Sequence, residues 1–96
     1  MGNVREEWRV IPKSRGQYEA STLGRIRNAH TGRVLRQFQF RNGSYGVTLA
    51  GYLNRSYTVS QLVGAAFYPD REGRACHRNG DVKDNRAENI EVRSVE

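Results

Sequence analysis

The chain is short, basic and polar. Its 96 residues and 11.0 kDa are the size of one small domain. Only 36% of the residues are hydrophobic, the mean hydropathy is -0.80, and no stretch approaches the roughly 18–20 apolar residues of a membrane span. No N-terminal segment has the pattern of a secretory signal, and a single cysteine, Cys76, excludes an internal disulfide. These features predict a cytoplasmic protein that does not associate with a membrane.

The positive charge is unevenly distributed along the chain. The net charge is +6, and 14 of the 16 basic residues are arginines, whose planar guanidinium suits phosphate oxygens and base edges. Residues 1–58 carry ten basic and three acidic side chains, whereas residues 59–96 carry six and seven. No carboxylate occurs between Glu19 and Asp70, a stretch that contains Arg25, Arg27, Arg33, Arg36, Arg41 and Arg55. Such a stretch indicates a polyanionic partner, and the lack of a basic amphipathic helix favours nucleic acid over a membrane.

The first 58 residues are predicted to form short antiparallel strands separated by glycine-containing turns. In the strand around Ile26 we expect this side chain to point inward and Arg25 and Arg27 outward, because successive residues of a strand face opposite ways. The large aromatic residues are expected in the core: Trp8, Phe38, Phe40, Tyr45 and Phe67. Strands are expected over residues 8–11, 18–21, 24–28, 32–35, 38–40, 45–49 and 56–59. Together they predict a small antiparallel β meander with an arginine-rich face.

From Ser60 the hydrophobic period changes to that of a helix. Ser60 is a plausible N-cap, apolar residues recur at helical spacing up to Phe67, and Pro69 stops the helix. Two further short strands are expected over residues 75–77 and 89–93. The whole pattern predicts an α+β fold in which one buried helix completes the core.

The two C-terminal strands and the turn between them carry a recognisable motif. Residues 76–81 read Cys-His-Arg-Asn-Gly-Asp and residues 84–91 read Asp-Asn-Arg-Ala-Glu-Asn-Ile-Glu. This segment resembles the core of phage HNH endonucleases, and residues 62–69 are similar to the helix and proline that precede that core. Near the N-terminus, residues 7–12 and 18–27 resemble the NUMOD4 module, which often precedes HNH cores in phage homing endonucleases. The resemblance implies a NUMOD4-like, arginine-rich β module over residues 1–58 and an HNH-like core over residues 59–96, within one compact unit.

The resemblance also implies a chemistry. In the family, the histidine of the first strand takes a proton from the attacking water, and His77 occupies that position. An imidazole suits this step because its ordinary pKa lies near neutrality. The family's asparagine on the second strand holds the histidine ring, and Asn89 occupies that position. A divalent cation, Mg²⁺ or Mn²⁺, stabilises the charge of the transition state, and a helix after the second strand completes the ββα-metal motif.

The sequence departs from the family pattern in three places. Cys76 precedes His77, and a soft thiol is a poor ligand for a hard cation. Ser60-Gln61 stand where the family commonly has His-Arg. The final helix should begin near residue 94, and the sequence ends at Glu96. These differences predict the two-strand part of the motif without its final helix, and a degenerate site.

Three functions remain open on this basis. The first is a double-stranded DNA-binding protein derived from an HNH endonuclease, with weak or lost cleavage, whose arginines between residues 25 and 55 lie along the DNA backbone. The second is an active HNH nicking endonuclease that uses Mg²⁺ or Mn²⁺, with His77 and Asn89 as catalytic residues. Its replacement cation ligand would come from Asp81, Asp84 or a second subunit. The third is a phage protein that binds a host protein, because an arginine surface also docks an acidic protein.

Overall fold

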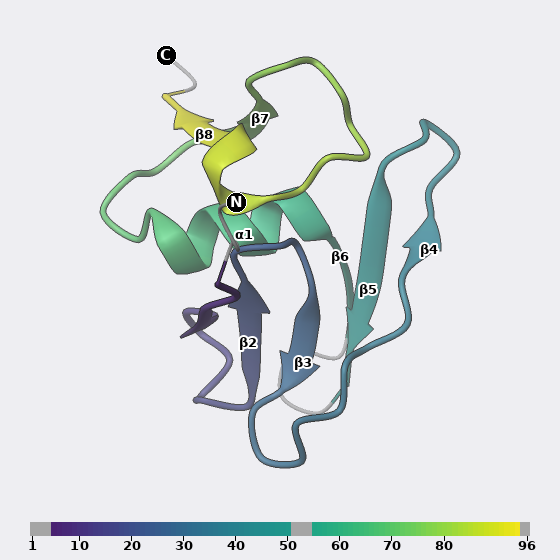
Figure 1. The fold of residues 1–96 in the computed structure, drawn as a ribbon, viewed down its shortest axis with the longest axis vertical. Coiled ribbons are helices and arrows are strands. Elements are labelled where there is room, and N and C mark those ends of the chain that lie inside the picture. Colours follow the sequence, from purple (N-terminus) through teal and green to yellow (C-terminus); the bar gives the residue numbers. More distant parts are fainter. Residues whose placement is uncertain (1–4, 51–54, 95–96) are drawn as a thin grey trace.

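Three small antiparallel sheets surround one α-helix in this computed structural model, which describes residues 5–50 and 55–94 (Figure 1). The first sheet has the strand order β1-β2-β3, the second β4-β5-β6, and the third pairs β7 with β8. The elements of the first two sheets are β1 (Trp8–Val10), β2 (Tyr18–Ser21), β3 (Ile26–Asn28), β4 (Phe38–Gln39), β5 (Tyr45–Leu49) and β6 (Arg55–Thr58). They are followed by α1 (Val59–Phe67), β7 (Arg74–His77), a 3-10 turn η1 (Ala87–Asn89) and β8 (Ile90–Arg93).

The predicted α+β class is confirmed, and the predicted meander divides into two sheets. The strands over residues 18–21 and 45–49 have the expected bounds. Residues 32–35, expected as a strand, contribute only the single bridge between Val34 and Arg27. Because residues 29–37 hold no strand, the first sheet ends at β3 and the second begins at β4. The arginines of this stretch therefore do not share one continuous sheet face.

The helix begins two residues earlier than the sequence suggested. Thr58, and not Ser60, is the N-cap: its side-chain oxygen accepts a hydrogen bond from the backbone N–H of Gln61. Val59, expected at the end of a strand, is the first helical residue. Both threonine and serine cap helices well, so composition alone did not separate them. The helix ends at Phe67, before Pro69, as predicted.

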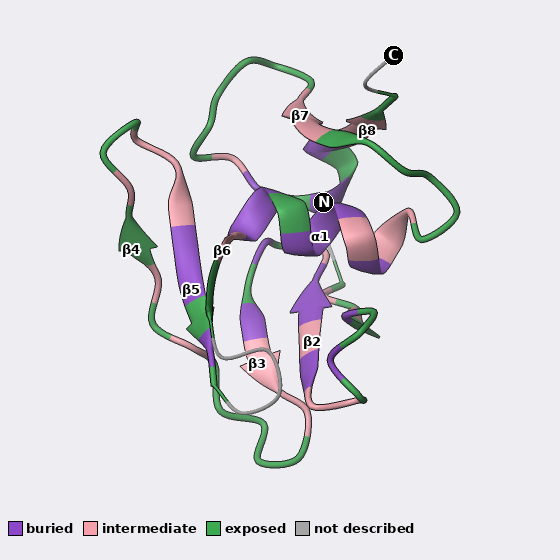
Figure 2. Ribbon diagram, turned by 180° about the vertical axis from the view of Figure 1, so that it is seen from behind, coloured by how far each residue is buried: buried purple, intermediate pink, exposed green. Residues whose placement is uncertain are grey.

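The core lies where α1 meets all three sheets. Val63 and Leu62 of α1 pack with Ala20 and Ile26 of the first sheet, Val47 and Leu49 of the second, and Ile90 of β8 in one hydrophobic cluster. Figure 2 shows this buried surface on α1, β2 and β5. At Gly64 the helix comes close to the third sheet, because a Cβ built there would lie 3.2 Å from Cγ2 of Val92. One core therefore joins the N-terminal strands to the β7–β8 hairpin.

Not every aromatic residue predicted for the core lies in it. Phe38 is 39% exposed on β4, at the edge of the second sheet, so its assignment to the core was wrong. Phe38 faces Gly46 across the pair of strands, and the ring of Phe40 fills the space where a Gly46 side chain would stand. Phe40 thus takes the covered position, and Phe38 is left at the surface.

None of the helices in the described part of the chain has the length and apolar character of a membrane span.

Candidate nucleic-acid interface

His77 stands at the end of β7, where the chain enters the loop that leads to η1. Its ring Nε2 lies 2.8 Å from Oδ1 of Asn85, a residue that is only 7% exposed. Because an amide oxygen can only accept, Nε2 donates this bond in the neutral ring, and Nδ1 keeps its lone pair. The arrangement holds the imidazole in one orientation with one nitrogen left as a base.

Asn89 does not hold the His77 ring, so this expectation from the resemblance was wrong. The Asn89 amide donates to Oδ1 of Asn79 (3.0 Å) and to the backbone oxygen of Asp84 (2.9 Å), and its Oδ1 accepts from the Asn79 N–H (3.2 Å). Asn89 lies in η1, one residue before β8, and its side chain ties the two ends of the loop together. Asn85 performs the role assigned to Asn89. Two asparagines four residues apart in the same motif gave no sequence signal to distinguish them.

The carboxylates of this loop are engaged with neighbouring groups. Asp84 accepts from Nε and Nη2 of Arg86, each at 2.8 Å, and from the Asn79 amide at 3.2 Å. The hydrogen bonds from Arg86 lower the pKa of Asp84 from 3.8 to about 2. Asp81 is exposed, and its Oδ1 accepts from the backbone N–H of Lys83 at 3.0 Å.

The residues around His77 do not fit a site for Mg²⁺ or Mn²⁺. These hard cations select carboxylate oxygens, and the described residues bring no three His, Cys, Asp or Glu side chains together. Cys76 precedes His77 on β7, so its side chain faces the other side of the strand, where its thiol contacts the backbone oxygen of Arg74 at 3.7 Å. The oxygens of Asp84 face Arg86 instead of an open position.

Two of the six candidate arginines are neutralised by carboxylates. Nε of Arg25 donates to Glu6 at 2.8 Å, and Nε of Arg27 donates to Glu19 at 2.7 Å. Both guanidinium groups also lie over the ring of Trp8, at 4.0 Å for Arg27 and 5.5 Å for Arg25. The hydrogen bond from Arg25 lowers the pKa of Glu6. We refer to Arg25 and Arg27 as the paired arginines.

Three other candidates have open guanidinium groups. Arg33, Arg36 and Arg41 are all exposed, and no carboxylate of the described residues forms an ion pair with them. We call these three the open arginines. They lie on the connection from β3 to β4 and on the β4–β5 turn, which follow one long edge of the molecule (Figure 1). Arg55, the sixth candidate, is exposed at the start of β6 and lies 5.7 Å from the ring of Tyr57.

The edge that carries the open arginines meets the His77 loop at one end. A Cβ built on Gly43, in the β4–β5 turn, would lie 3.9 Å from Cγ2 of Val82. Val82 belongs to the loop between β7 and η1, and it is 41% exposed. Figure 1 shows this loop arching toward the β4–β5 turn. One end of this edge therefore lies beside the loop that follows His77.

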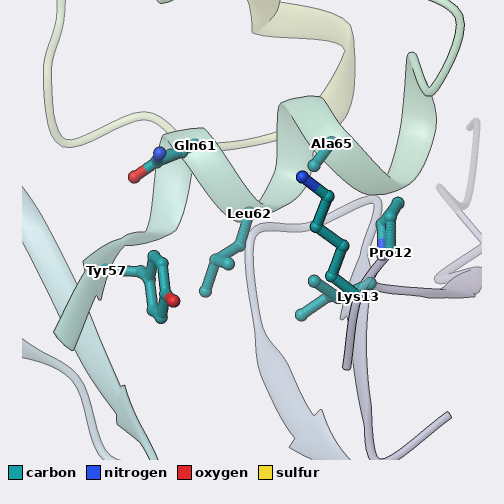
Figure 3. Close-up of a pocket in the computed structure, with 7 residues that line it drawn as sticks. Pro12, Lys13, Tyr57, Gln61, Leu62 and Ala65 are labelled. Atoms are coloured by element: carbon teal, nitrogen blue, oxygen red, sulfur yellow. The ribbon is translucent and has the colours of Figure 1, made fainter. Parts of the chain in front are cut away.

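A separate pocket lies between the N-terminal strands and α1. It has a volume of ≈ 350 Å³ and is lined by Ile11, Pro12, Lys13, Tyr57, Gln61, Leu62 and Ala65. In Figure 3 the Lys13 side chain runs along the pocket with its ammonium end toward α1. The candidate residues His77 and Asn89 and the six arginines do not line it.

Comparison with known proteins identifies the N-terminal part of the chain. The family model described as the NUMOD4 motif matches residues 6–50. Residues 6–50 therefore match the NUMOD4 motif, and we refer to this segment by that name. The paired and the open arginines all lie within the NUMOD4 motif, whereas Arg55 and His77 lie outside it. The resemblance of residues 7–27 to this module is thereby confirmed.

A solved structure extends the similarity over most of the chain. It is described as DNA binding and cleavage by the HNH homing endonuclease I-HmuI, and it matches with a TM-score of 0.78 at 23% sequence identity. The match covers 92% of this chain and 52% of that one, so this chain spans about half the length of its structural relative. The predicted resemblance to HNH homing endonucleases is confirmed at the level of the fold. No curated protein matches the chain significantly.

Proposed function

We propose that this chain binds double-stranded DNA as a relative of HNH homing endonucleases, and that its own cleavage activity is weak or lost. The observation that carries the proposal is the set of open arginines. Three exposed guanidinium groups, without a carboxylate partner among residues 5–50 and 55–94, lie along one edge of the NUMOD4 motif. Each is free to replace the counterions of a phosphate, which is the sequence-independent part of DNA affinity.

The exposed face of the second sheet also supports the proposal of DNA binding. Thr48 and Ser56 face outward on β5 and β6, and their hydroxyls are 3.0 Å apart. Phe38 is exposed at the edge of this sheet, in edge-to-face contact with Phe40 at 5.0 Å between ring centroids. Exposed hydroxyls and an aromatic edge are suited to contacts with sugars and base edges. The structural relative is described for DNA binding, which agrees with this use of the fold.

The His77 loop supports weak or lost cleavage. Phosphodiester hydrolysis needs a base for the water and positive charge on the scissile phosphate. His77 suits the role of base, because the Asn85 bond leaves its Nδ1 as an acceptor. For the second, Asp84 is bound by Arg86, and Cys76 supplies a thiol where an oxygen ligand is preferred. A base without an evident cation ligand among the described residues supports weak or lost cleavage.

The second candidate, a metal-dependent nicking endonuclease, is favoured by the orientation of His77. One experiment separates it from the DNA-binding protein. Supercoiled plasmid is incubated with the protein in Mg²⁺, Mn²⁺ or EDTA, beside His77→Ala, and each sample is also run for a mobility shift. We expect a shift in all three conditions and no nicking above the His77→Ala level. Metal-dependent nicking that disappears in His77→Ala would establish the enzyme instead.

A third outcome would contradict both candidates. If neither a shift nor a nick occurs at low salt, the open arginines serve another acidic partner, and a host protein becomes the leading one. Competition then decides: excess random-sequence duplex displaces a protein bound to a DNA surface and leaves a separate protein–protein complex intact.

A further inference from the structure

The turn between β2 and β3 touches the loop that carries the partner of His77. This turn belongs to the NUMOD4 motif, and the loop belongs to the β7–β8 segment. Gly24, with φ of +86°, lies directly against Asn85: a Cβ built on Gly24 would be 2.9 Å from the Asn85 backbone oxygen and 3.1 Å from its Cβ. Contacts below 3.0 Å essentially never occur for a real Cβ. Only glycine fits this position without a shift of Asn85.

The turn itself is held firmly. Ser21 is fully buried, and its hydroxyl oxygen accepts from the backbone N–H groups of Leu23 and Arg25, each at 3.1 Å. From outside, the side-chain amide of Gln37 donates to the backbone oxygen of Gly24 at 2.9 Å. Gln37 stands between Arg36 and Phe38 in the sequence, so the segment of the open arginines is tied to this turn.

Asn85 has little freedom to move away from the turn. On its N-terminal side, the backbone oxygen of Asp84 accepts from the Asn89 amide at 2.9 Å. On its C-terminal side, the backbone N–H of Ala87 donates to the oxygen of Thr22 at 2.8 Å. Its side-chain oxygen then meets Nε2 of His77 at 2.8 Å. The position of the imidazole therefore depends on a residue that is held between its own loop and the NUMOD4 turn.

We propose that Gly24 is a positioning residue for His77, and that the NUMOD4 motif, besides any role in DNA binding, sets the orientation of the imidazole through Asn85. Any larger side chain at Gly24 must displace Asn85 and so break the Asn85–His77 hydrogen bond. The inference does not depend on DNA binding or cleavage, because it concerns the ring in the free protein. The two proposals can therefore fail separately.

The test measures the ring N–H of His77 by NMR, at a pH where the imidazole is neutral. In the unaltered protein the Nε2–H proton is bonded to Asn85 and should exchange slowly with water. Asn85→Ala should accelerate its exchange at least tenfold, and we expect Gly24→Ala to do the same. The exposed His30 provides an internal reference for an imidazole at the surface.

Gly32→Ala is the matched control. Gly32 also has a positive φ, +75°, and a Cβ built there meets nothing within 4 Å. This variant introduces the same backbone strain without touching the His77 loop, so the Nε2–H exchange should stay as in the unaltered protein. Equal acceleration in Gly24→Ala and Gly32→Ala would overturn the inference, because strain alone would explain it. Unchanged exchange in Gly24→Ala would overturn it as well.

A second variant covers the case in which Gly24→Ala fails to fold. Gln37→Ala removes one hydrogen bond to the turn and leaves the core residues in place. Signals of Ile26 and Ile90, both fully buried, report whether the core is intact. With an intact core we expect a several-fold faster Nε2–H exchange, because the turn that supports Asn85 loosens. No change in Gln37→Ala, together with an unfolded Gly24→Ala, would contradict the positioning role.

Discussion

The paired and the open arginines come from one uninterrupted acid-free stretch of sequence, yet the fold gives them different surroundings. Strand pairing in the first sheet places Glu19 of β2 opposite Arg27 of β3, and Glu6, shortly before β1, forms an ion pair with Arg25, just before β3. The connection to β4 leaves the sheet, so Arg33 and Arg36 meet no carboxylate among the described residues. A stretch of sequence without acidic residues therefore forms a basic surface only where no neighbouring segment of the fold supplies a carboxylate.

The largest expected effect is on DNA affinity when the open arginines are removed. In Arg33→Ala with Arg36→Ala and Arg41→Ala, up to three phosphate contacts are lost, and each accounts for about 0.9 of the slope of log K against log salt. The slope should become shallower by about 2.7, with an affinity loss on the order of 100-fold at 0.1 M salt. Fluorescence anisotropy with a labelled random duplex measures both.

The control for this triple variant removes one arginine that is engaged with a carboxylate elsewhere. Arg86 and Arg93 form ion pairs with Asp84 and Glu91 in the C-terminal part of the chain. Arg93→Ala should change the slope little. If Arg93→Ala weakened binding as much per charge as the triple variant does, net charge, and not the open edge, would account for the affinity.

A smaller effect is expected when the paired arginines are removed. Arg25→Ala with Arg27→Ala takes away cations that are already neutralised, so DNA affinity should fall much less than in the triple variant. Stability should fall by about 1–2 kcal/mol, because two partly exposed ion pairs and the stacking on Trp8 are lost. Anisotropy and urea unfolding measure the two effects. A loss of affinity equal to that of the open arginines would erase the distinction between the two sets.

Removing the carboxylate partners of the paired arginines tests the same difference between the paired and the open arginines in the opposite direction. Glu6→Gln with Glu19→Gln leaves Arg25 and Arg27 unneutralised, so the paired arginines should become available to phosphates. We expect a few-fold gain in DNA affinity at low salt and a steeper salt slope. Glu88→Gln, a change of an exposed acid beside Arg86, is the control and should gain less. Unchanged affinity in the double variant would place the first sheet outside the interface.

The smallest effect concerns the C-terminal loop, where Asp84 is bound by Arg86. The pKa of Asp84 in the folded protein is about 2, below its ordinary 3.8. A depressed pKa means that the pair stabilises the fold fully above about pH 4 and loses this contribution as the pH falls toward 2. The Asp84 carboxyl carbon, followed by NMR, should titrate near pH 2 and move up toward 3.8 in Arg86→Gln. A midpoint near 3.8 in the unaltered protein would show that the ion pair does not form.

The resemblance located the motif of the site but not its contacts. His77 was identified from the residues around it, and the structure places it at the end of β7 as expected. Its partner was assigned to Asn89 because that position fits the family pattern. The partner is Asn85, because η1 turns the Asn89 side chain toward Asn79 and the backbone of Asp84. Sequence spacing fixes which strand a residue precedes, and it does not fix the direction of a side chain in a 3-10 turn.

The sequence by itself determined the class of fold, the order of its main elements and the resemblance to NUMOD4 and HNH proteins. These depend on local patterns: alternation in the strands, helical spacing after Thr58, and turn residues between them. Only the tertiary structure decided which arginines pair with carboxylates, that Phe38 lies at the surface, and that Gly24 lies against Asn85. The reason is physical: ion pairs, exposure and steric contact form between residues far apart in the chain, and no local pattern specifies them.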